Sequence, residues 1–189
     1  SFHTCHRENR IAPMRWLYFI PVMIFLAVAG IAGYFLLSGE NPQALPSTLI
    51  DQEVPASDLA LLGDTSRLTA TSFATDKITL VNYFASWCLP CRAEHAQLMS
   101  LSKQQDVSLT GIAWKDKTED TQSFLQELGN PFGRVALDTS GRTGIDWGVY
   151  GVPETFIIDG MGKIRYRHVG PIMPQDMDRI QAVLRKLKP

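Results

Sequence analysis

The chain has 189 residues, of which 45% are hydrophobic, and its formal net charge is −1. This length and composition suit one ordinary folded domain. Neither basic nor acidic side chains form a long run, so a nucleic-acid or polyanion partner is not expected.

An N-terminal apolar segment is the first predicted element. Residues 16–37, WLYFIPVMIFLAVAGIAGYFLL, contain no charged side chain and are long enough to cross a ~30 Å hydrocarbon layer as one helix. Arg7, Arg10 and Arg15 precede the segment, and no lysine or arginine follows it until Arg67. By the positive-inside rule, this asymmetry predicts a cytoplasmic tail at residues 1–15 and a translocated remainder. The alternative is a cleaved signal peptide, although its apolar region usually spans about 7 to 15 residues.

The residues on either side of this predicted anchor are interpreted as non-catalytic. Met14 followed by a basic residue and an apolar run is typical of a native start, so residues 1–13 are interpreted as an upstream extension. Cys5 lies there beside two histidines, but a single thiol is too little for a metal site. Residues 38–48, which include SGENPQALPS, are predicted to be a short tether to a domain at residues 49–189.

The domain is predicted to be α/β, with a mixed β-sheet flanked by helices. β-branched and aromatic runs predict strands at residues 78–87 and 107–114, and residues 90–104 between them have an imperfect helical pattern. A strand, helix, strand order implies a parallel pair joined by a right-handed crossover. Further elements are a helix at 119–129, an edge strand at 134–138, a hairpin at 154–170 and a helix from Pro174.

Cys88 and Cys91 stand three positions apart where the strand at 78–87 gives way to a helix. A helix N-terminus presents free N–H groups and partial positive charge, which stabilise a thiolate. Cys88 is therefore predicted to be the acidic, attacking sulfur. Cys91, one turn further along, would resolve the mixed disulfide.

Two other interpretations of this cysteine pair remain open. Structural zinc requires four ligands, but the domain has no third cysteine, and His95 and His168 are its only histidines. A permanent structural disulfide would close a very short loop and so contribute little entropic stabilisation. Exchange chemistry is the preferred interpretation, and it requires no metal and no bound cofactor.

The motifs FASWCLPCRAE and YGVPETFIID resemble those of the thioredoxin superfamily. More narrowly, WCLPCRAEH, LGNPF and GVYGVPETFIIDGMGKIRYRHVG are similar to the membrane-anchored CcmG/DsbE family of cytochrome c biogenesis. The resemblance implies a thioredoxin-like protein facing the periplasm from the bacterial inner membrane. It would take electrons from a transmembrane thiol carrier and reduce the haem-binding cysteines of apocytochrome c, directly or through a maturation thiol protein.

The resemblance also assigns residues that support the Cys88–Cys91 pair. Pro153 matches the superfamily's cis-proline, which leaves the backbone of Val152 available to pair with an extended substrate. Glu94 and Glu154 match the acidic residues of this family's active site. Trp87 offers a flat apolar contact for a docking peptide, and Pro90 lies between the cysteines.

One position departs from thioredoxin itself. The buried carboxylate usually found six residues before the first cysteine is replaced by Asn82, and an amide cannot accept a proton at neutral pH. The candidates for a side-chain base are therefore Glu94 and Glu154, if burial raises the pKa of one of them. The alternative for Glu94 is an ordinary solvated helix residue.

Three neighbouring features receive structural interpretations. His95 is expected at the surface, because no geometry forces it toward the sulfurs. Trp114, which ends a strand, is expected in the core. Residues 115–120, KDKTED, are interpreted as a solvated loop before a helix.

Two rival functions also remain open. The same enzyme could run in the opposite direction, as a thiol oxidant or isomerase of the cell envelope, and only the reduction potential separates the two directions. Alternatively, the domain could bind unfolded apocytochrome through Trp87 and the Val152 edge without catalysis.

Overall fold

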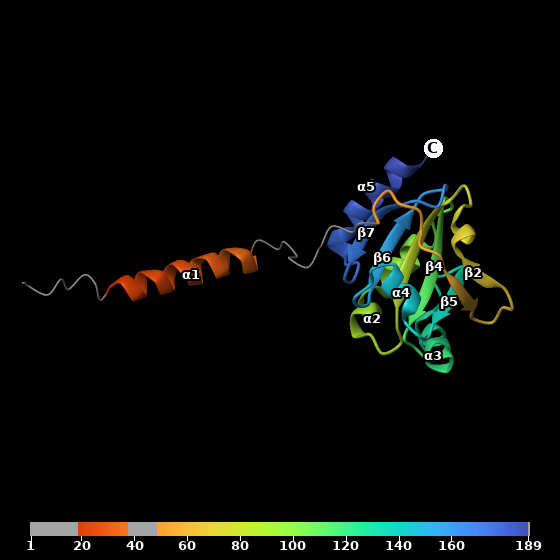
Figure 1. Cartoon of the computed structure of the whole chain (residues 1–189), viewed down its shortest axis with the longest axis horizontal. Coiled ribbons are helices and arrows are strands. Elements are labelled where there is room, and N and C mark those ends of the chain that lie inside the picture. Colours follow the sequence, from red (N-terminus) through yellow and green to blue (C-terminus); the bar gives the residue numbers. More distant parts are fainter. Residues whose placement is uncertain (1–18, 38–48, 189) are drawn as a thin grey trace, which may run out of the picture. The chain divides into compact units, whose positions relative to one another are not determined.

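The computed structural model describes residues 19–37 and 49–188 of the chain (Figure 1). The described residues fall into two units, a helix α1 (Ile20–Leu37) and a domain whose described residues are 49–188. The predicted cytoplasmic tail, the tether at residues 38–48 and the cluster around Cys5 lie outside the described residues.

The helix α1 covers most of the predicted transmembrane segment. It has 18 residues, whereas about 20 apolar residues are needed to span a bilayer. Across residues 19–37 and 49–188, no helix is both long and apolar enough to cross a membrane. The predicted transmembrane helix is therefore not confirmed.

The domain is built on one seven-stranded sheet in the order β2-β1-β5-β4-β3-β6-β7. The central strands β3, β4 and β5 run parallel, while β6, β7, β1 and β2 add antiparallel pairs on the two sides. The strands are β1 (Asp58–Leu61), β2 (Arg67–Thr69), β3 (Ile78–Phe84), β4 (Val107–Trp114), β5 (Arg134–Asp138), β6 (Glu154–Ile158) and β7 (Ile164–Val169). The predicted mixed sheet, its parallel pair and its C-terminal hairpin are confirmed.

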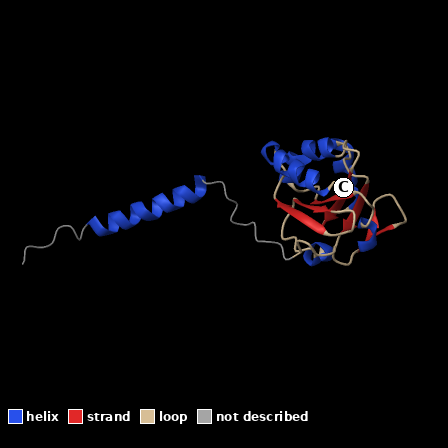
Figure 2. Ribbon diagram, turned by 90° about the horizontal axis from the view of Figure 1, so that it is seen from above, coloured by secondary structure: helices blue, strands red, loops and turns tan. Residues whose placement is uncertain are grey.

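Helices connect these strands and cover both faces of the sheet, as Figure 2 shows. They are η2 (Ala70–Phe73), α2 (Leu89–Leu101), α3 (Thr118–Leu128), α4 (Arg142–Asp146), η3 (Pro174–Asp176) and α5 (Met177–Leu187). The chain from Pro174 begins with a short 3₁₀ turn before α5, which suits the proline at that first position. The predicted helices are thus present, with ends shifted by one to three residues.

The expected edge position of the strand at 134–138 is wrong. This strand, β5, pairs with β4 on one side and with β1 on the other. The sequence interpretation did not include β1 and β2, which are only four and three residues long. Because these short strands form a hairpin that extends the sheet, β5 is an interior strand.

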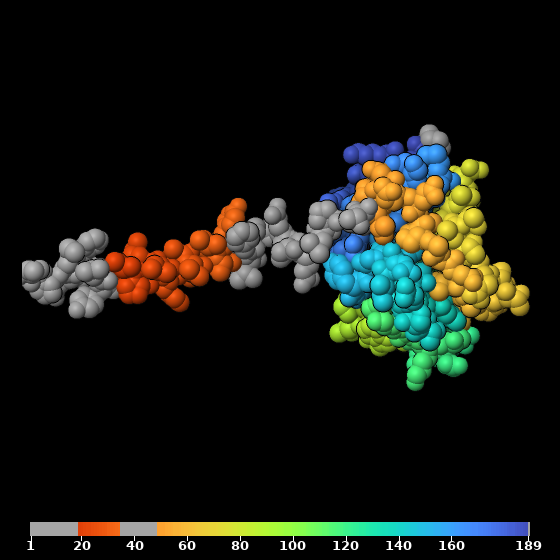
Figure 3. All heavy atoms as spheres, in the orientation of Figure 1, coloured from red at the N-terminus to blue at the C-terminus, as the bar shows by residue number. Residues whose placement is uncertain are grey.

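Alternate residues of β3 enter the two halves of the core. Leu80 and Phe84 face the half to which α2, α3 and α5 contribute their apolar side chains. Val81 and Tyr83 face the other half, where Trp147 follows α4. In Figure 3 the segment containing α4, coloured cyan, lies at the visible surface of the domain. β3 is therefore buried on both faces, which suits a central parallel strand.

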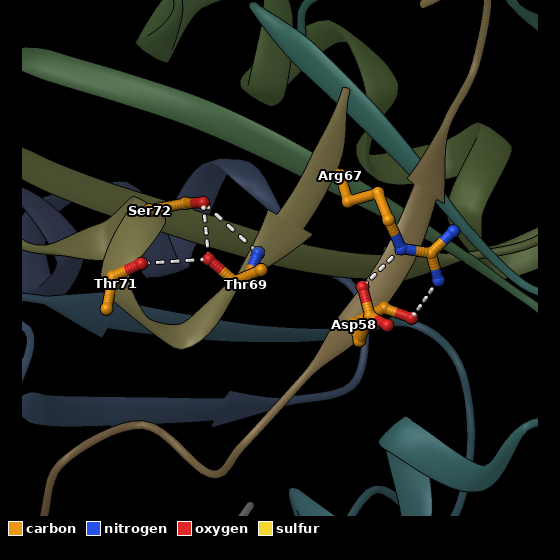
Figure 4. A network of polar contacts seen from close by, with 5 residues as sticks. All are labelled: Asp58, Arg67, Thr69, Thr71 and Ser72. Atoms are coloured by element: carbon orange, nitrogen blue, oxygen red, sulfur yellow. Dashed lines mark hydrogen bonds and ion pairs between the residues drawn. The ribbon is translucent and has the colours of Figure 1, made fainter. Parts of the chain in front are cut away.

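The hairpin of β1 and β2 is held by exposed polar contacts at one edge of the sheet (Figure 4). Arg67 donates to the Asp58 carboxylate across the hairpin, and its Nη2 donates to the Asp58 carbonyl at 2.7 Å. Thr69 Oγ1 lies 2.9 Å from Thr71 Oγ1, and Ser72 Oγ accepts from the Thr69 amide at 3.1 Å. This edge contains none of the predicted site residues.

The helix α2 carries the second cysteine into the protein. Its buried residues are spaced three or four apart and form one stripe along the helix: Cys91, Glu94, His95, Leu98 and Leu101. The helix begins directly after Cys88, and Pro90 occupies its first turn, where a missing N–H costs nothing. The cysteine pair therefore lies where α2 begins, shortly after β3 ends at Phe84.

Candidate active site

Cys88 and Cys91 are joined by a disulfide at the junction of β3 and α2, with their Cα atoms 5.3 Å apart. Cys88 is the N-cap residue of α2, and the Cys91 amide donates to Cys88 Sγ at 3.1 Å. The Cys88 amide in turn donates to the Ala85 carbonyl at 3.2 Å. Free N–H groups at a helix start favour negative charge, so this geometry favours a thiolate at Cys88 after reduction.

The loop before β6 lies against the disulfide. The peptide bond between Val152 and Pro153 is cis, which is the conformation that the resemblance implied. Cys88 Sγ lies 3.5 Å from the Val152 carbonyl oxygen, and Val152 is half-buried. The structure thus brings residues 64 positions apart in the sequence into contact at the sulfur.

Exposed apolar side chains flank the cysteine pair. Trp87 is 59% exposed and Leu89 is 77% exposed, whereas Cys88 and Cys91 are only 3% and 2% exposed in this oxidised state. The position of the Trp87 ring is fixed by a hydrogen bond, because its Nε1 donates to the Lys115 carbonyl at 3.3 Å. The neighbours of Cys88 therefore present apolar surface to an incoming chain, while the sulfurs themselves are largely covered.

Glu94 is fully buried beside this junction, and within residues 19–37 and 49–188 none of its hydrogen-bond partners is a cation. Its Oε1 accepts from Asn82 Nδ2 and its Oε2 accepts from the Ile172 amide, both at 2.8 Å. Burial raises the pKa of the Glu94 carboxyl to about 7, although these two hydrogen bonds act in the opposite direction. The interpretation of Glu94 as a solvated helix residue is therefore wrong.

Asn82, in the middle of β3, takes part in this network as a donor. Its Nδ2 also donates to Thr155 Oγ1 at 3.0 Å, while its buried Oδ1 has no partner within the described structure. The carboxylate that thioredoxin has at this point is thus replaced by an amide that hydrogen-bonds a carboxylate from α2. A titratable group is consequently present in the same region, supplied by Glu94.

Glu154 is also buried, but its surroundings differ. Its Oε2 lies 2.6 Å from Arg167 Nη2 and accepts from Arg167 Nε at 2.8 Å. Its Oε1 accepts from the amides of Tyr150 and Gly151 at 3.1 and 3.4 Å. These contacts join Arg167 to the backbone of residues 150 and 151, so Glu154 fixes the loop that leads to Val152.

The expected surface position of His95 is wrong. The residue is 6% exposed, and its Nε2 lies 3.0 Å from the Gly129 carbonyl. Burial lowers the pKa of the His95 imidazole, which disfavours its charged form. The helical spacing from Cys91 to Leu98 was the signal that could have placed His95 inside. Trp114, in contrast, is buried as predicted.

Two functional neighbours were not identified from the sequence. Asp116 belongs to the segment interpreted as a solvated loop, yet it is 4% exposed and accepts from the Ser86 amide at 2.7 Å. α3 also begins inside that segment, at Thr118. Arg167 was noted only as an alternating residue of a hairpin. No local pattern marks either residue, because their partners are far away in the sequence.

Metal binding has no candidate site in the part of the chain that the structure describes. No group of three or more histidine, cysteine or acidic side chains lies close enough there to hold an ion. The geometry at Cys88 and Cys91 suits thiol–disulfide exchange, and the pKa of Glu94 suits this residue to proton transfer.

Comparisons with known proteins agree with this chemistry. The redoxin family matches residues 50–184 of the chain. The thiol:disulfide interchange protein HelX of Rhodobacter capsulatus is 43% identical over 156 residues, which cover 82% of this chain and 88% of HelX. A DsbE homologue of Paracoccus denitrificans, also named a thiol:disulfide interchange protein, is 45% identical over 167 residues, or 88% of this chain and 90% of the relative.

A solved structure agrees as well. The crystal structure of a proposed thiol:disulfide interchange protein DsbE from Chlorobium tepidum has a TM-score of 0.60 and 30% identity, covering 74% of this chain and 99% of that one. Sequence, fold and the Cys88–Cys91 disulfide all point to the same class of enzyme. The chain belongs to the redoxin family, among the DsbE-type thiol:disulfide interchange proteins, and is a thiol:disulfide oxidoreductase.

Proposed function

We propose that this protein is a reductant of cytochrome c maturation, which keeps the haem-binding cysteines of apocytochrome c reduced. The proposal rests on the family membership and on the motif resemblance to CcmG/DsbE proteins. The single observation that carries the chemistry is the Cys88–Cys91 disulfide at the start of α2, with Cys88 Sγ 3.5 Å from the Val152 carbonyl.

The exchange begins from the reduced pair. The Cys88 thiolate attacks one sulfur of the substrate disulfide, the substrate S–S bond breaks, and the other substrate sulfur leaves as a thiolate. Cys91 then gives up its proton and attacks Cys88 Sγ, which releases the second substrate thiol. Two electrons have passed to the substrate, and Cys88 and Cys91 are left as the disulfide seen in the structure.

Glu94 is the proposed proton acceptor for Cys91. The two residues lie one turn apart on the buried stripe of α2, and Glu94 has a pKa of about 7, near the value at which a general base works best. Glu154 is less suited, because Arg167 pairs with its carboxylate. Of the two candidate bases, Glu94 and Glu154, only Glu94 is therefore proposed to accept the proton.

The proposed substrate contacts surround Cys88. An extended peptide would pair with the backbone at Val152 and place apolar side chains against Trp87 and Leu89, which are both exposed. An unfolded apocytochrome c segment meets this requirement, since its cysteines lie in extended chain before haem attachment. A maturation thiol protein presenting such a loop would meet it equally.

The proposed location is the periplasmic side of the bacterial inner membrane. The supporting observation is the uncharged run at residues 16–37, which follows three arginines. Attachment through one N-terminal helix would raise the effective concentration of the domain near a transmembrane thiol–disulfide electron donor. That donor would return the Cys88–Cys91 disulfide to the dithiol after each turnover.

Trapping the intermediate tests this mechanism. In the full-length protein, Cys91→Ser removes the resolving thiol, so incubation with an oxidised Cys-x-x-Cys-His peptide should accumulate a mixed disulfide at Cys88. The complex should be visible by mass spectrometry and should disappear on reduction. The matched Cys88→Ser variant should form none. Recovery of no complex with Cys91→Ser would contradict the mechanism.

The direction of exchange is tested by the reduction potential of the Cys88–Cys91 pair, measured against glutathione. A reductant should lie toward the thioredoxin value of about −270 mV, whereas a value toward about −120 mV would make the protein an oxidant. A double Cys88→Ser, Cys91→Ser variant that kept full cytochrome c production would instead favour a binding module without catalysis.

A further inference from the structure

Asp116 is a buried carboxylate that lies outside the exchange mechanism described above. It follows β4 directly and is 4% exposed. Its Oδ2 accepts from the Ser86 amide at 2.7 Å and from Thr121 Oγ1 at 3.0 Å. Its Oδ1 accepts from Ser86 Oγ at 2.8 Å and from the Lys117 amide at 2.9 Å. One side chain thus receives four hydrogen bonds, two of them from a single residue near the disulfide.

The sheet explains why these segments meet. β3 and β4 are parallel, with Phe84 opposite Ala113 at their ends, so the two loops that follow leave the same edge of the sheet. One loop carries Ser86, Trp87 and Cys88. The other loop carries Asp116. In the sequence, Trp87 alone stands between Ser86, which hydrogen-bonds Asp116, and the attacking Cys88.

A second contact ties the same two loops together. Trp87 Nε1 donates to the carbonyl of Lys115 at 3.3 Å, and Lys115 has a positive φ of 51°. The approach to Cys88 is therefore fixed at two consecutive residues, Ser86 by a side chain and Trp87 by a backbone carbonyl. Loss of Asp116 would remove the stronger, charge-assisted part of this attachment.

We propose that Asp116 is a positioning residue for thiol exchange, which acts by fixing Ser86 and Trp87 so that Cys88 stays at the start of α2. This inference rests on the proposed exchange at Cys88 and Cys91. Asp116 itself contacts neither sulfur by any hydrogen bond of the described structure. Its effect would be transmitted through the backbone from Ser86 to Cys88.

The substitution Asp116→Asn tests the inference. An asparagine has one oxygen and one NH₂ group, so it must turn a donor toward at least one backbone amide, either that of Ser86 or that of Lys117. In the full-length protein, reduction of an oxidised Cys-x-x-Cys-His peptide should slow by about tenfold, because small displacements of reacting groups are costly. The pH midpoint for alkylation of Cys88 should rise, because the sulfur is held less firmly at the helix start.

The matched control is Asp120→Asn, which removes the same charge from an exposed position four residues later. This variant should react within about twofold of the unmodified protein, as expected for an exposed charge. Should Asp116→Asn match Asp120→Asn in both peptide reduction and Cys88 alkylation, Asp116 would be merely structural and the inference would be overturned.

A second variant keeps the test decisive if Asp116→Asn does not fold. Ser86 is half-buried, and Ser86→Ala removes the hydroxyl contact to Asp116 while keeping the amide contact. The loss of one hydrogen bond should slow exchange by about threefold, and an unchanged rate would overturn the inference.

The two proposals fail in different ways. The alkylation midpoint and the reduction potential of the Cys88–Cys91 pair are properties of the protein alone. If the unmodified protein does not reduce the peptide, the proposed function fails, yet a shifted midpoint in Asp116→Asn would still uphold the positioning role. An unshifted midpoint and potential would reject that role alone.

Discussion

Two buried carboxylates near the disulfide, Glu94 on α2 and Glu154 on β6, are both almost fully excluded from solvent. Glu154 faces Arg167, whereas the contacts of Glu94 are an amide side chain and a backbone N–H. Two glutamates that are equally buried therefore have different roles. Pairing with a cation keeps Glu154 suited to a structural task, and the lack of such pairing leaves Glu94 able to exchange a proton near neutral pH.

The largest effect should come from breaking the Glu154 pair. Arg167→Met leaves a carboxylate buried without its counter-charge, which should lower the free energy of unfolding by about 3–5 kcal/mol. The measurement is urea unfolding of the full-length protein at neutral pH. Adding Glu154→Gln to Arg167→Met should restore part of the loss, because no buried charge then remains.

Arg165→Met provides the comparison for this result. Arg165 lies on the same strand and pairs with Asp159 and Asp51, but its own side chain is 29% exposed, compared with 8% for Arg167. Arg165→Met should therefore lower the free energy of unfolding clearly less than Arg167→Met does. Equal losses in the two variants would show that the Glu154 pair has no special importance.

A smaller, pH-dependent effect is expected at Glu94. Burial raises its pKa from 4.5 to about 7, so the stability contribution of neutral Glu94 is fully present below about pH 4.5 and is lost as the pH rises through 7. Glu94→Gln cannot ionise and should gain stability relative to the unmodified protein over this window, by about 3 kcal/mol. Urea unfolding of both proteins at about pH 4, 5, 6, 7 and 8 measures this difference in the free energy of unfolding.

The same variant should change the rate of exchange. If Glu94 accepts the Cys91 proton, the rate of peptide reduction rises with pH through about 7 in the unmodified protein, and this rise should vanish in Glu94→Gln. Glu127→Gln, at an exposed position paired with Arg92, is the control and should keep the rise. A stability difference that did not vary with pH would contradict the assignment of Glu94.

The smallest effect is expected at the exposed pair of Arg67 and Asp58, which lies on the β1–β2 hairpin (Figure 4). Both side chains are more than half exposed, so water and salt screen their attraction. Arg67→Ala should leave urea unfolding unchanged within experimental error and should not alter peptide reduction. A loss comparable with that of Arg167→Met would show that burial does not explain why the Glu154–Arg167 pair matters more than an exposed pair.

Local patterns predicted much of the framework around the disulfide. The strand at β3, the helix α2 and the cysteine pair between them follow from runs of apolar and β-branched residues within a few positions of one another. The edge position of β5 was predicted wrongly, because the short strands of β1 and β2 leave almost no periodic signal. The apolar pattern of α2 does not predict the buried position of His95, because histidine is not one of the apolar residues that define the pattern.

Other parts of the site had no local signal at all. In the sequence, Asp116 is one acidic residue in a polar segment, yet in the structure it hydrogen-bonds Ser86, 30 positions away. In the sequence, Arg167 is one of the alternating polar residues of a hairpin strand, yet in the structure it forms an ion pair with Glu154 across the β6–β7 pair. These contacts depend on strand order and register, which short-range patterns do not specify.

The amino-acid sequence alone places two cysteines, three positions apart, between a strand and a helix, because both the spacing and the helix start are local properties. Which carboxylate beside them is paired with a cation, and which is not, depends on the folded structure. The fold also sets which distant loop fixes the residues before Cys88. Charge state and position depend on burial and on partners that the folded sheet brings together from far along the chain.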